Sequence, residues 1–167
     1  MARMNAAGVH VDIDLGQQTL VVLDAGDHEL RRYLVSTATK GGGEFEGSNQ
    51  TPRGRHRIRA KIGADAPRGT VFKGRRPTGE IYSPELAEAA PRRDWILTRI
   101  LWLCGEEVGV NRLGAMDTMR RYIYIHGAAD TAVMGKPGSI GCIRMTSDDV
   151  IDLFDRVVVG TKVNIHE

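Results

Sequence analysis

The chain of 167 residues is poor in cysteine, in aromatic side chains and in net charge. Two cysteines cannot form a disulfide framework for a chain of this length. The net charge is only +2, with 26% charged and 41% hydrophobic residues, which is an ordinary globular composition. We expect a single domain over residues 1–167, long enough to bury a core.

Long hydrophobic runs are also missing, and this bears on where the protein acts. No segment approaches the length of a transmembrane helix. In residues 1–15, Asp12 and Asp14 interrupt the apolar residues, so we see no signal peptide. The sequence therefore predicts a cytoplasmic protein with no membrane partner. A chain trimmed of its leader would look the same, which leaves a periplasmic location open.

Positive charge is dense in one stretch, where Arg53, Arg55, Arg57, Arg59 and Lys61 alternate with other residues. One interpretation is the solvated face of a strand. The other is a surface that attracts an anionic substrate. A nucleic-acid-binding module is disfavoured, because no aromatic residues interleave the basic ones and no zinc or helix-turn-helix signature is present.

Twenty glycines and alternating apolar residues favour a β-rich fold. We expect a mainly β domain with sandwich-like packing of mixed sheets and one or two short helices. The predicted strands span residues 9–15, 19–23, 30–36, 54–62, 71–73, 95–103, 121–126 and 162–165. The first three should form an antiparallel meander, and 95–103 is a buried central strand or, as the alternative, a helix. Residues 39–51 are a polar loop, and helices are expected from Pro84 to Ala90 and after Thr146.

One histidine and one cysteine are candidates for catalysis. His126 ends the predicted strand and precedes a turn at Gly127, so its imidazole should lie at the rim of a sheet. Cys142 follows Gly141, which lets the backbone approach an acyl substrate closely. A neighbouring imidazolium and a helix start downstream would lower the thiol pKa from about 8.5. On spacing alone, a packed cysteine and a structural histidine are the more common explanation for such residues.

A resemblance favours catalysis. The segment Tyr124-Ile125-His126-Gly127, followed by Ser139-Ile140-Gly141-Cys142 and then Ile143-Arg144-Met145, resembles the signature of the L,D-transpeptidase catalytic domain. Upstream, Thr51-Pro52-Arg53-Gly54 resembles the Thr-Pro-x-Gly element of that family, and Val35-Ser36-Thr37 fits the strand that precedes it. The resemblance covers residues 9–165. One position departs, since Ile140 stands where the family usually has histidine.

The resemblance implies a role for each matching residue. Cys142 would be the nucleophile, His126 the general base and then acid, and the Gly127 carbonyl would orient the imidazole. Backbone N–H groups at Ile140, Gly141 and Cys142 would stabilise the oxyanion. The residues implied to line the substrate site are Ser139, Arg144 and Tyr124, with Arg144 pairing with a carboxylate. No metal and no cofactor is implied, and Cys104 is expected to be an inert buried thiol.

The implied substrates are peptidoglycan tetrapeptide stems or soluble muropeptides. Cys142 would attack the diaminopimelate carbonyl and release D-alanine. Without a visible leader, we expect a cytoplasmic L,D-carboxypeptidase of muropeptide recycling. The alternatives are a periplasmic L,D-transpeptidase that forms cross-links or exchanges D-amino acids, and a peptidoglycan-binding module without catalysis. Oligomeric state is left open.

Overall fold

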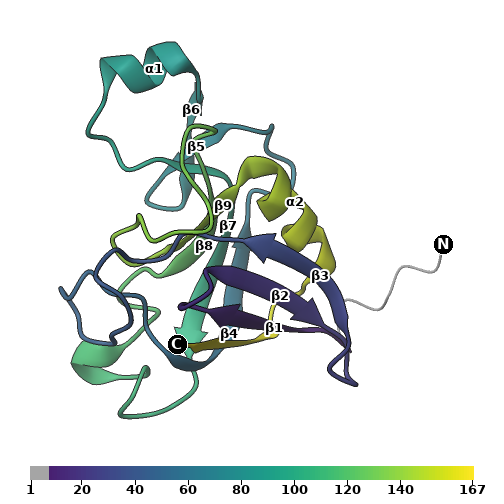
Figure 1. Ribbon diagram of the computed structural model, residues 1–167. Coiled ribbons are helices and arrows are strands. Elements are labelled where there is room, and N and C mark those ends of the chain that lie inside the picture. The colour runs from purple at the N-terminus through teal and green to yellow at the C-terminus, as the bar shows by residue number, and fades with distance from the viewer. Residues whose placement is uncertain (1–7) are drawn as a thin grey trace.

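Ten strands and two short α-helices make up the fold in the computed structural model, which describes residues 8–167 (Figure 1). The strands are β1 (His10–Asp14), β2 (Thr19–Leu23), β3 (Glu29–Leu34), β4 (Gly54–Ile62), β5 (Thr70–Lys73), β6 (Arg76–Ile81), β7 (Ile96–Gly105), β8 (Tyr124–Ala128), β9 (Ile143–Thr146) and β10 (Lys162–His166). The helices are α1 (Pro84–Ala89), the 3-10 helix η2 (Gly114–Met116) and α2 (Ser147–Arg156). The predicted mainly β fold with two short helices is confirmed.

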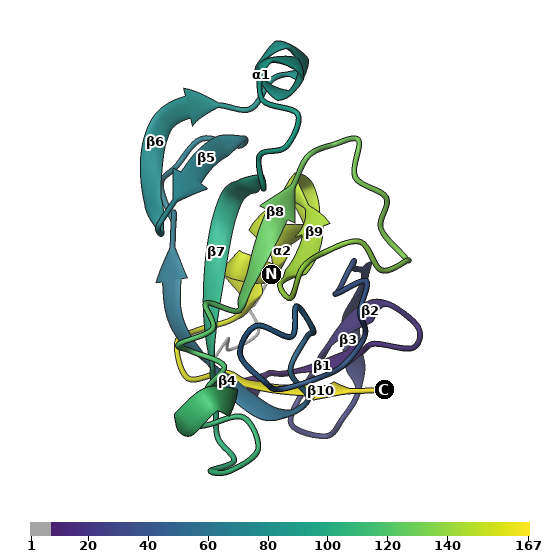
Figure 2. The same ribbon diagram turned by 90° about the vertical axis from the view of Figure 1, so that its left-hand side faces the viewer.

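All strands belong to one curled mixed sheet, in the order β3-β2-β1-β10-β4-β7-β5-β6, with β8 and β9 branching from β7. The first three strands form the predicted antiparallel meander. β10 pairs parallel to β1, so the first and last strands of the described chain lie side by side (Figure 2). The long strand β7 is central, because β4, β5 and β8 all pair with it, which excludes the helical alternative for this segment.

The core lies inside the curl of this sheet, and α2 covers it (Figure 2). Alternate residues of β1, Val11 and Ile13, point inward and are almost fully buried. From α2, Val150 and Phe154 pack against the same core. The hydroxyl of Thr146 accepts a hydrogen bond of 3.1 Å from the Asp149 N–H and so caps the helix start.

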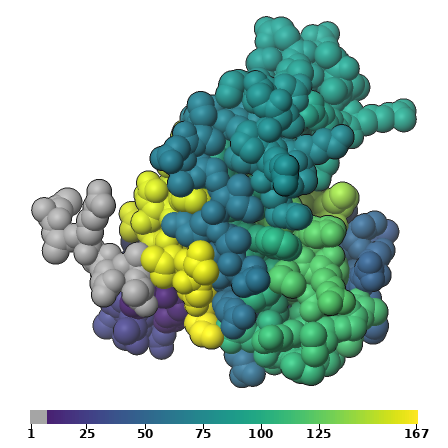
Figure 3. All heavy atoms as spheres, turned by 180° about the vertical axis from the view of Figure 1, so that it is seen from behind, coloured from purple at the N-terminus to yellow at the C-terminus, as the bar shows by residue number. Residues whose placement is uncertain are grey.

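A protruding arm is built from β5, β6 and α1 (Figures 1 and 3). The sequence analysis places no strand between residues 73 and 95, so β6 is not predicted. Gly74 and Arg75 both have positive φ, 56° and 64°, which is the geometry of a tight hairpin turn. β6 pairs only with β5 and is largely exposed, so it carries no apolar periodicity that a sequence pattern could detect.

The strand predicted over residues 121–126 is wrong in its bounds. Tyr122 has a φ of 56°, which breaks the strand, and β8 begins only at Tyr124. The predicted turn at Gly127 is also wrong, because Gly127 continues β8 and pairs with Leu97. A Cβ at Gly127 would lie 2.5 Å from the Leu97 carbonyl oxygen, so only glycine fits beside β7. His126 therefore lies within a strand and is 1% exposed, not at the sheet rim.

The short strand β9 was also missed, and it pairs parallel to β8. This pairing places His126 beside Arg144 and brings Cys142, which directly precedes β9, next to the start of β8. Among residues 8–167, no helix is long and apolar enough to cross a membrane.

Candidate active site

The loop before β9 holds Cys142 in place through Ser139. The Ser139 hydroxyl donates a hydrogen bond of 2.6 Å to the Cys142 carbonyl and accepts one of 3.2 Å from the Gly141 N–H. Gly141 has a φ of 141°, a conformation that favours glycine, and a Cβ there would press on Ile123 at 3.3 Å. Ser139 also lines the pocket, but both hydrogen bonds of its hydroxyl are made to the backbone of its own loop.

The sulfur of Cys142 lies between two backbone groups. The Tyr124 N–H donates to Sγ at 3.3 Å, and the thiol donates to the Tyr122 carbonyl at 3.5 Å. Cys142 opens partly into a pocket of about 530 Å³, whose lining includes Tyr124, His126 and Arg144. The structure thus brings these residues, which the sequence analysis identified as candidates, into one cavity.

The thiol is not activated in this state. Surrounding protein atoms raise the pKa of Cys142 to about 12, although the Tyr124 N–H and the charge of Arg121 act in the lowering direction. The expected fall in pKa is therefore wrong for this structure. The start of α2, which was expected to help lower this pKa, is too distant to do so. The four residues of β9 separate Cys142 from the start of α2, a rise of about 13 Å along the strand.

His126 is oriented by its neighbour. Its Nδ1 lies 2.7 Å from the Gly127 carbonyl oxygen. A carbonyl can only accept, so Nδ1 carries the proton and Nε2 keeps a free lone pair. Burial lowers the pKa of His126, and this keeps the ring neutral at neutral pH. The imidazole can therefore act as a base through Nε2.

No hydrogen bond joins His126 to Cys142 in the described part of the chain. The thiol proton is directed to the Tyr122 carbonyl instead. Both side chains nevertheless line the same pocket, His126 from β8 and Cys142 from the loop that leads into the adjacent strand β9. Catalytic hydrogen bonds are often long in an empty site and shorten when substrate binds.

Two N–H groups of the loop are available to an oxyanion. Within residues 8–167, the backbone N–H groups of Ile140 and Cys142 have no hydrogen-bond partner. The Gly141 N–H differs from the expectation, because it already donates to Ser139. Unpaired N–H groups beside a nucleophile can stabilise the charge of a tetrahedral intermediate.

Arg144 reaches the pocket from β9. One of its terminal nitrogens donates to the Ser36 hydroxyl at 2.9 Å, whereas its Nε is buried and has no partner among residues 8–167. Burial lowers the pKa of the Arg144 guanidinium. A buried donor without a partner is costly, so this group can donate a hydrogen bond to an anionic ligand.

Comparison with known proteins decides the family. The L,D-transpeptidase catalytic domain model (YkuD) matches residues 8–165. The chain belongs to the L,D-transpeptidase catalytic domain family. Its sequence is also similar to YqjB of Bacillus subtilis (strain 168), whose name carries the term L,D-transpeptidase, with 45% identity over 51 residues, 30% of this chain and 29% of YqjB.

Solved L,D-transpeptidases share the fold. An L,D-transpeptidase from Mycobacterium smegmatis matches with a TM-score of 0.54 and 20% identity, over 96% of this chain and 59% of that one. L,D-transpeptidase 3 from Mycobacterium tuberculosis, in complex with a faropenem-derived adduct, matches with a TM-score of 0.57 and 15% identity, over 96% of this chain and 60% of that one. The chain thus spans about 60% of these two structures and under a third of YqjB.

The Thr-Pro-x-Gly element of this L,D-transpeptidase domain contacts the loop that carries Cys142. The Thr51 hydroxyl donates a hydrogen bond of 2.9 Å to the Gly141 carbonyl and accepts one of 3.0 Å from the Ala38 N–H. Ile140, the position that departs from the family, is 67% exposed. It also lines the pocket, so its side chain lies at the pocket mouth and is not packed beneath the loop.

Three charged residues of the site escaped the sequence analysis. Arg121 donates to the carbonyls of Gly43, Glu44 and Gln50, and to the Ser48 hydroxyl, so it holds the 39–51 loop beside Cys142. Asp94 and Arg75 line the pocket from outside the signature segments. Their positions in the sequence carry no signal, because each is brought to the pocket by long-range strand pairing.

Arg75 enters the site from the tip of the β5–β6 hairpin. Its guanidinium lies 4.4 Å from the centre of the Trp102 ring and 5.1 Å from that of Tyr122, and it donates to the Tyr124 hydroxyl at 2.9 Å. These contacts bring the arm to the rim of the catalytic pocket. Cys104, in contrast, is buried in β7 and lines a different cavity.

Proposed function

We propose that this domain is a cysteine acyltransferase that acts on the stem peptides of peptidoglycan, with Cys142 as nucleophile. One observation carries the proposal: a thiol, a neutral imidazole with a free Nε2 and two unpartnered N–H groups meet in one pocket. This is the set of groups that acyl transfer through a thioester requires. Family membership supports peptidoglycan as the substrate.

The proposed first half-reaction transfers the stem peptide to sulfur. Nε2 of His126 takes the thiol proton as Sγ of Cys142 attacks the diaminopimelate carbonyl. The N–H groups of Ile140 and Cys142 stabilise the oxyanion that forms. His126 then gives the proton to the leaving amine, so D-alanine departs and a thioester remains.

Burial of the sulfur among protein atoms accounts for the high pKa of the resting thiol. A neutral thiol beside a neutral imidazole avoids two uncompensated charges among these buried groups. Substrate binding would displace the thiol from the Tyr122 carbonyl and turn its proton toward Nε2. Arg144, with its free Nε, is placed to bind a carboxylate of the stem.

The acyl acceptor separates two candidate activities. A second groove of about 200 Å³ adjoins the catalytic pocket and shares Tyr122, Ile123 and Ile140 with it. Glu46 and Arg120 also line this groove, so it offers both signs of charge to the amine and carboxylate of an amino-acid acceptor. This groove favours transfer to an amine, which is L,D-transpeptidation.

Hydrolysis is the other candidate, and it was the activity expected from the sequence. The sulfur is open to the pocket, so water can reach a thioester. An L,D-carboxypeptidase working on soluble muropeptides would suit a cytoplasmic enzyme, whereas cross-linking requires access to the wall. Both the cytoplasmic location and the recycling role remain proposals, which cell fractionation would test.

Product analysis by mass spectrometry distinguishes these activities. Disaccharide-tetrapeptide is incubated alone, then with added diaminopimelate or a D-amino acid, and Cys142→Ala serves as the control. Dimers or exchanged tetrapeptides in excess of tripeptide support transfer, and dominant tripeptide supports hydrolysis. Binding without any turnover would overturn both and leave the binding-module reading.

An acylating probe tests the nucleophile independently of the acceptor. A faropenem-derived adduct occurs in L,D-transpeptidase 3 from Mycobacterium tuberculosis. We expect faropenem to add a covalent mass to this chain and the mass to map to Cys142. An adduct on Cys104, or none in a folded protein, would contradict the assignment.

A further inference from the structure

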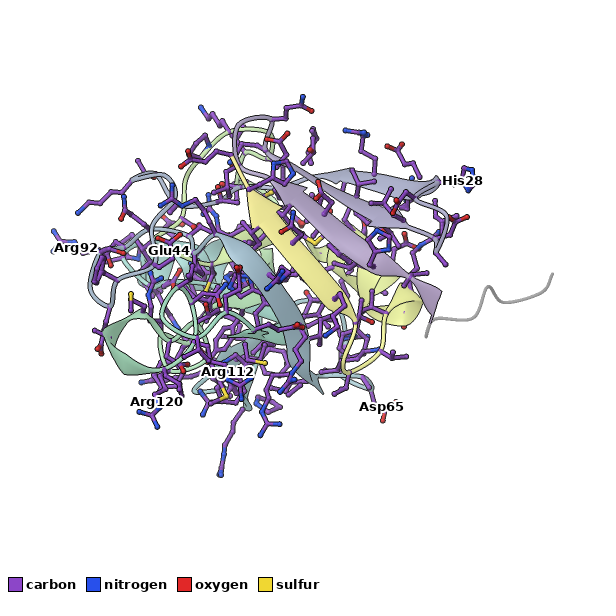
Figure 4. The ribbon with its side chains drawn as sticks, turned by 90° about the horizontal axis from the view of Figure 1, so that it is seen from below. His28, Glu44, Asp65, Arg92, Arg112 and Arg120 are labelled. Atoms are coloured by element: carbon purple, nitrogen blue, oxygen red, sulfur yellow. The ribbon has the colours of Figure 1, made fainter. Side chains whose placement is uncertain are left out.

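A second cavity, separate from the catalytic pocket, is lined by unpaired arginines. It has a volume of about 280 Å³ and lies between β4, the end of β7 and the segment 112–120. We call it the arginine cavity, after Arg57, Arg59, Arg112 and Arg120. Figure 4 shows Arg112 and Arg120 on the same side of the molecule, and Figure 3 shows the green segment around residues 106–120 next to the blue strand β4.

The fold forces these four side chains to converge. In β4, His56 and Ile58 point into the protein, so Arg57 and Arg59 share the opposite face. Arg57 pairs across the sheet with Cys104, whose side chain forms part of the cavity wall. The sequence left open whether this alternating basic run is a solvated face or an anion-binding surface.

The segment that brings the other two arginines is held rigidly by Asp117. Its carboxylate accepts hydrogen bonds from the Leu113 N–H at 2.7 Å and from the Arg120 N–H at 3.0 Å. Burial acts to raise the pKa of Asp117, but these bonds and the nearby charge of Arg120 lower it below its usual value, so it is ionised at neutral pH. Both carboxylate oxygens accept hydrogen bonds from backbone N–H groups, and within residues 8–167 neither forms a salt bridge with a guanidinium of the cavity.

The positive charge of the cavity is therefore only partly compensated. Within residues 8–167, none of the four arginines forms a salt bridge, whereas seven other arginines of the chain do. The four guanidiniums and the Asp117 carboxylate, four positive charges less one negative, leave a charge of +3 around one small space. A concave site lined by one sign of charge concentrates ions of the other sign.

We propose that the arginine cavity binds a phosphate-class anion, with diphosphate as the best match. Guanidinium groups pair bidentately with phosphate oxygens, and a diphosphate carries enough negative charge to offset most of the +3. The volume lies just below the range of about 300–1,000 Å³ found for small-molecule pockets, which suits a small anion and not a whole nucleotide. The site stands independently of the proposed acyl transfer at Cys142.

Calorimetric titration with inorganic diphosphate at low ionic strength tests the proposal. The variants are Arg59→Ala and Arg112→Ala, because both side chains are exposed and neither lines the catalytic pocket or its adjoining groove. Each should weaken binding about tenfold, the usual effect of removing one charged hydrogen-bonding partner. Arg76→Ala is the matched control, since Arg76 is exposed, lies on β6 and is not part of the cavity.

Further arms identify the chemistry of the ligand. Arg59→Lys keeps the charge but loses the planar fork, so it should bind diphosphate more weakly than the unchanged protein and more tightly than Arg59→Ala. Inorganic phosphate and dimethyl phosphate show whether a free phosphate or an internal diester is preferred, and citrate tests carboxylates. The turnover of a soluble tetrapeptide substrate should be the same in Arg59→Ala, which separates this site from the catalytic one.

Three results would overturn the proposal. The first is the absence of saturable diphosphate binding, and the second is binding that survives both alanine substitutions unchanged. The third is citrate binding as tight as that of diphosphate, which would replace phosphate by carboxylate chemistry. An unchanged melting temperature in the unliganded variants establishes that any lost binding comes from the cavity and not from unfolding.

Discussion

The hydroxyl of Thr51 donates a hydrogen bond to the carbonyl of Gly141, across 90 positions of the sequence. This bond joins the Thr-Pro-x-Gly element to the loop that carries the nucleophile. We expect Thr51→Val to lower kcat/KM about fivefold or more and the free energy of unfolding by about 1–3 kcal/mol, because it leaves a buried acceptor and the Ala38 N–H unpaired. Thr51→Ser should retain most of both, as measured by kinetics and denaturant titration. Equal losses in the two variants would show that the methyl group matters as much as the hydroxyl, and a loss in Thr51→Ser alone would contradict the role of the hydrogen bond.

The two cysteines should behave differently in turnover. Cys142→Ala removes the proposed nucleophile and should reduce kcat by at least about a thousandfold while the circular dichroism spectrum is unchanged. Cys104→Ala should retain activity, since Cys104 is buried in β7 away from the catalytic pocket. Residual activity in Cys142→Ala close to that of the unchanged protein would refute the assignment.

Alkylation of Cys142 should respond to pH as a raised thiol pKa requires. Only the thiolate reacts, and a folded-state pKa of about 12 means that the thiolate fraction keeps growing through pH 9 to 11. We expect the rate of modification by iodoacetamide, measured in a Cys104→Ala background, to rise over this whole range without a plateau near 8.5. A plateau below pH 7 would indicate a thiolate–imidazolium pair in the resting enzyme instead.

The acid limb of kcat/KM should lie below pH 6.5. Burial lowers the pKa of His126, so the ring stays neutral, and competent as a base, to lower pH than a free imidazole. Activity should be lost only as pH falls through this lowered pKa. A pH–rate profile with its acid midpoint above 6.5 would mean that another group controls the limb or that the imidazole is charged.

Arg75 should contribute to substrate binding and not to the chemical step. Its guanidinium stacks over Trp102 and bonds to Tyr124 at the rim of the catalytic pocket. We expect Arg75→Ala to raise KM roughly fivefold, the effect of about 1 kcal/mol, with a smaller change in kcat. The neighbouring Arg76→Ala is the control, and a fall in kcat without a change in KM would place Arg75 in the chemistry instead.

Short-range patterns in the sequence predicted much of this fold. The alternation of Val11 and Ile13 with polar residues marked β1, and Pro84 after Ser83 marked the start of α1, since both signals depend only on neighbouring residues. The spacing of His126 and Cys142 resembled the family signature, and both residues do line one pocket. The same short-range patterns did not predict β6 or the start of β8. At these places the positive φ angles of Gly74, Arg75 and Tyr122 set the direction of the chain.

Burial and the pairing of distant segments decided the rest. The thiol pKa is high because protein atoms surround the sulfur, and no residue adjacent to Cys142 in the sequence signals that surrounding. Arg121 reaches the 39–51 loop through a contact across 71 positions of the sequence, and Thr51 reaches the loop that carries Cys142 through a contact across 90 positions. The four arginines of the second cavity come from β4 and from a segment some fifty residues later, so their shared charge exists only once the sheet has formed. Periodicity is a property of consecutive residues, whereas electrostatic environment depends on everything within a few ångströms in space.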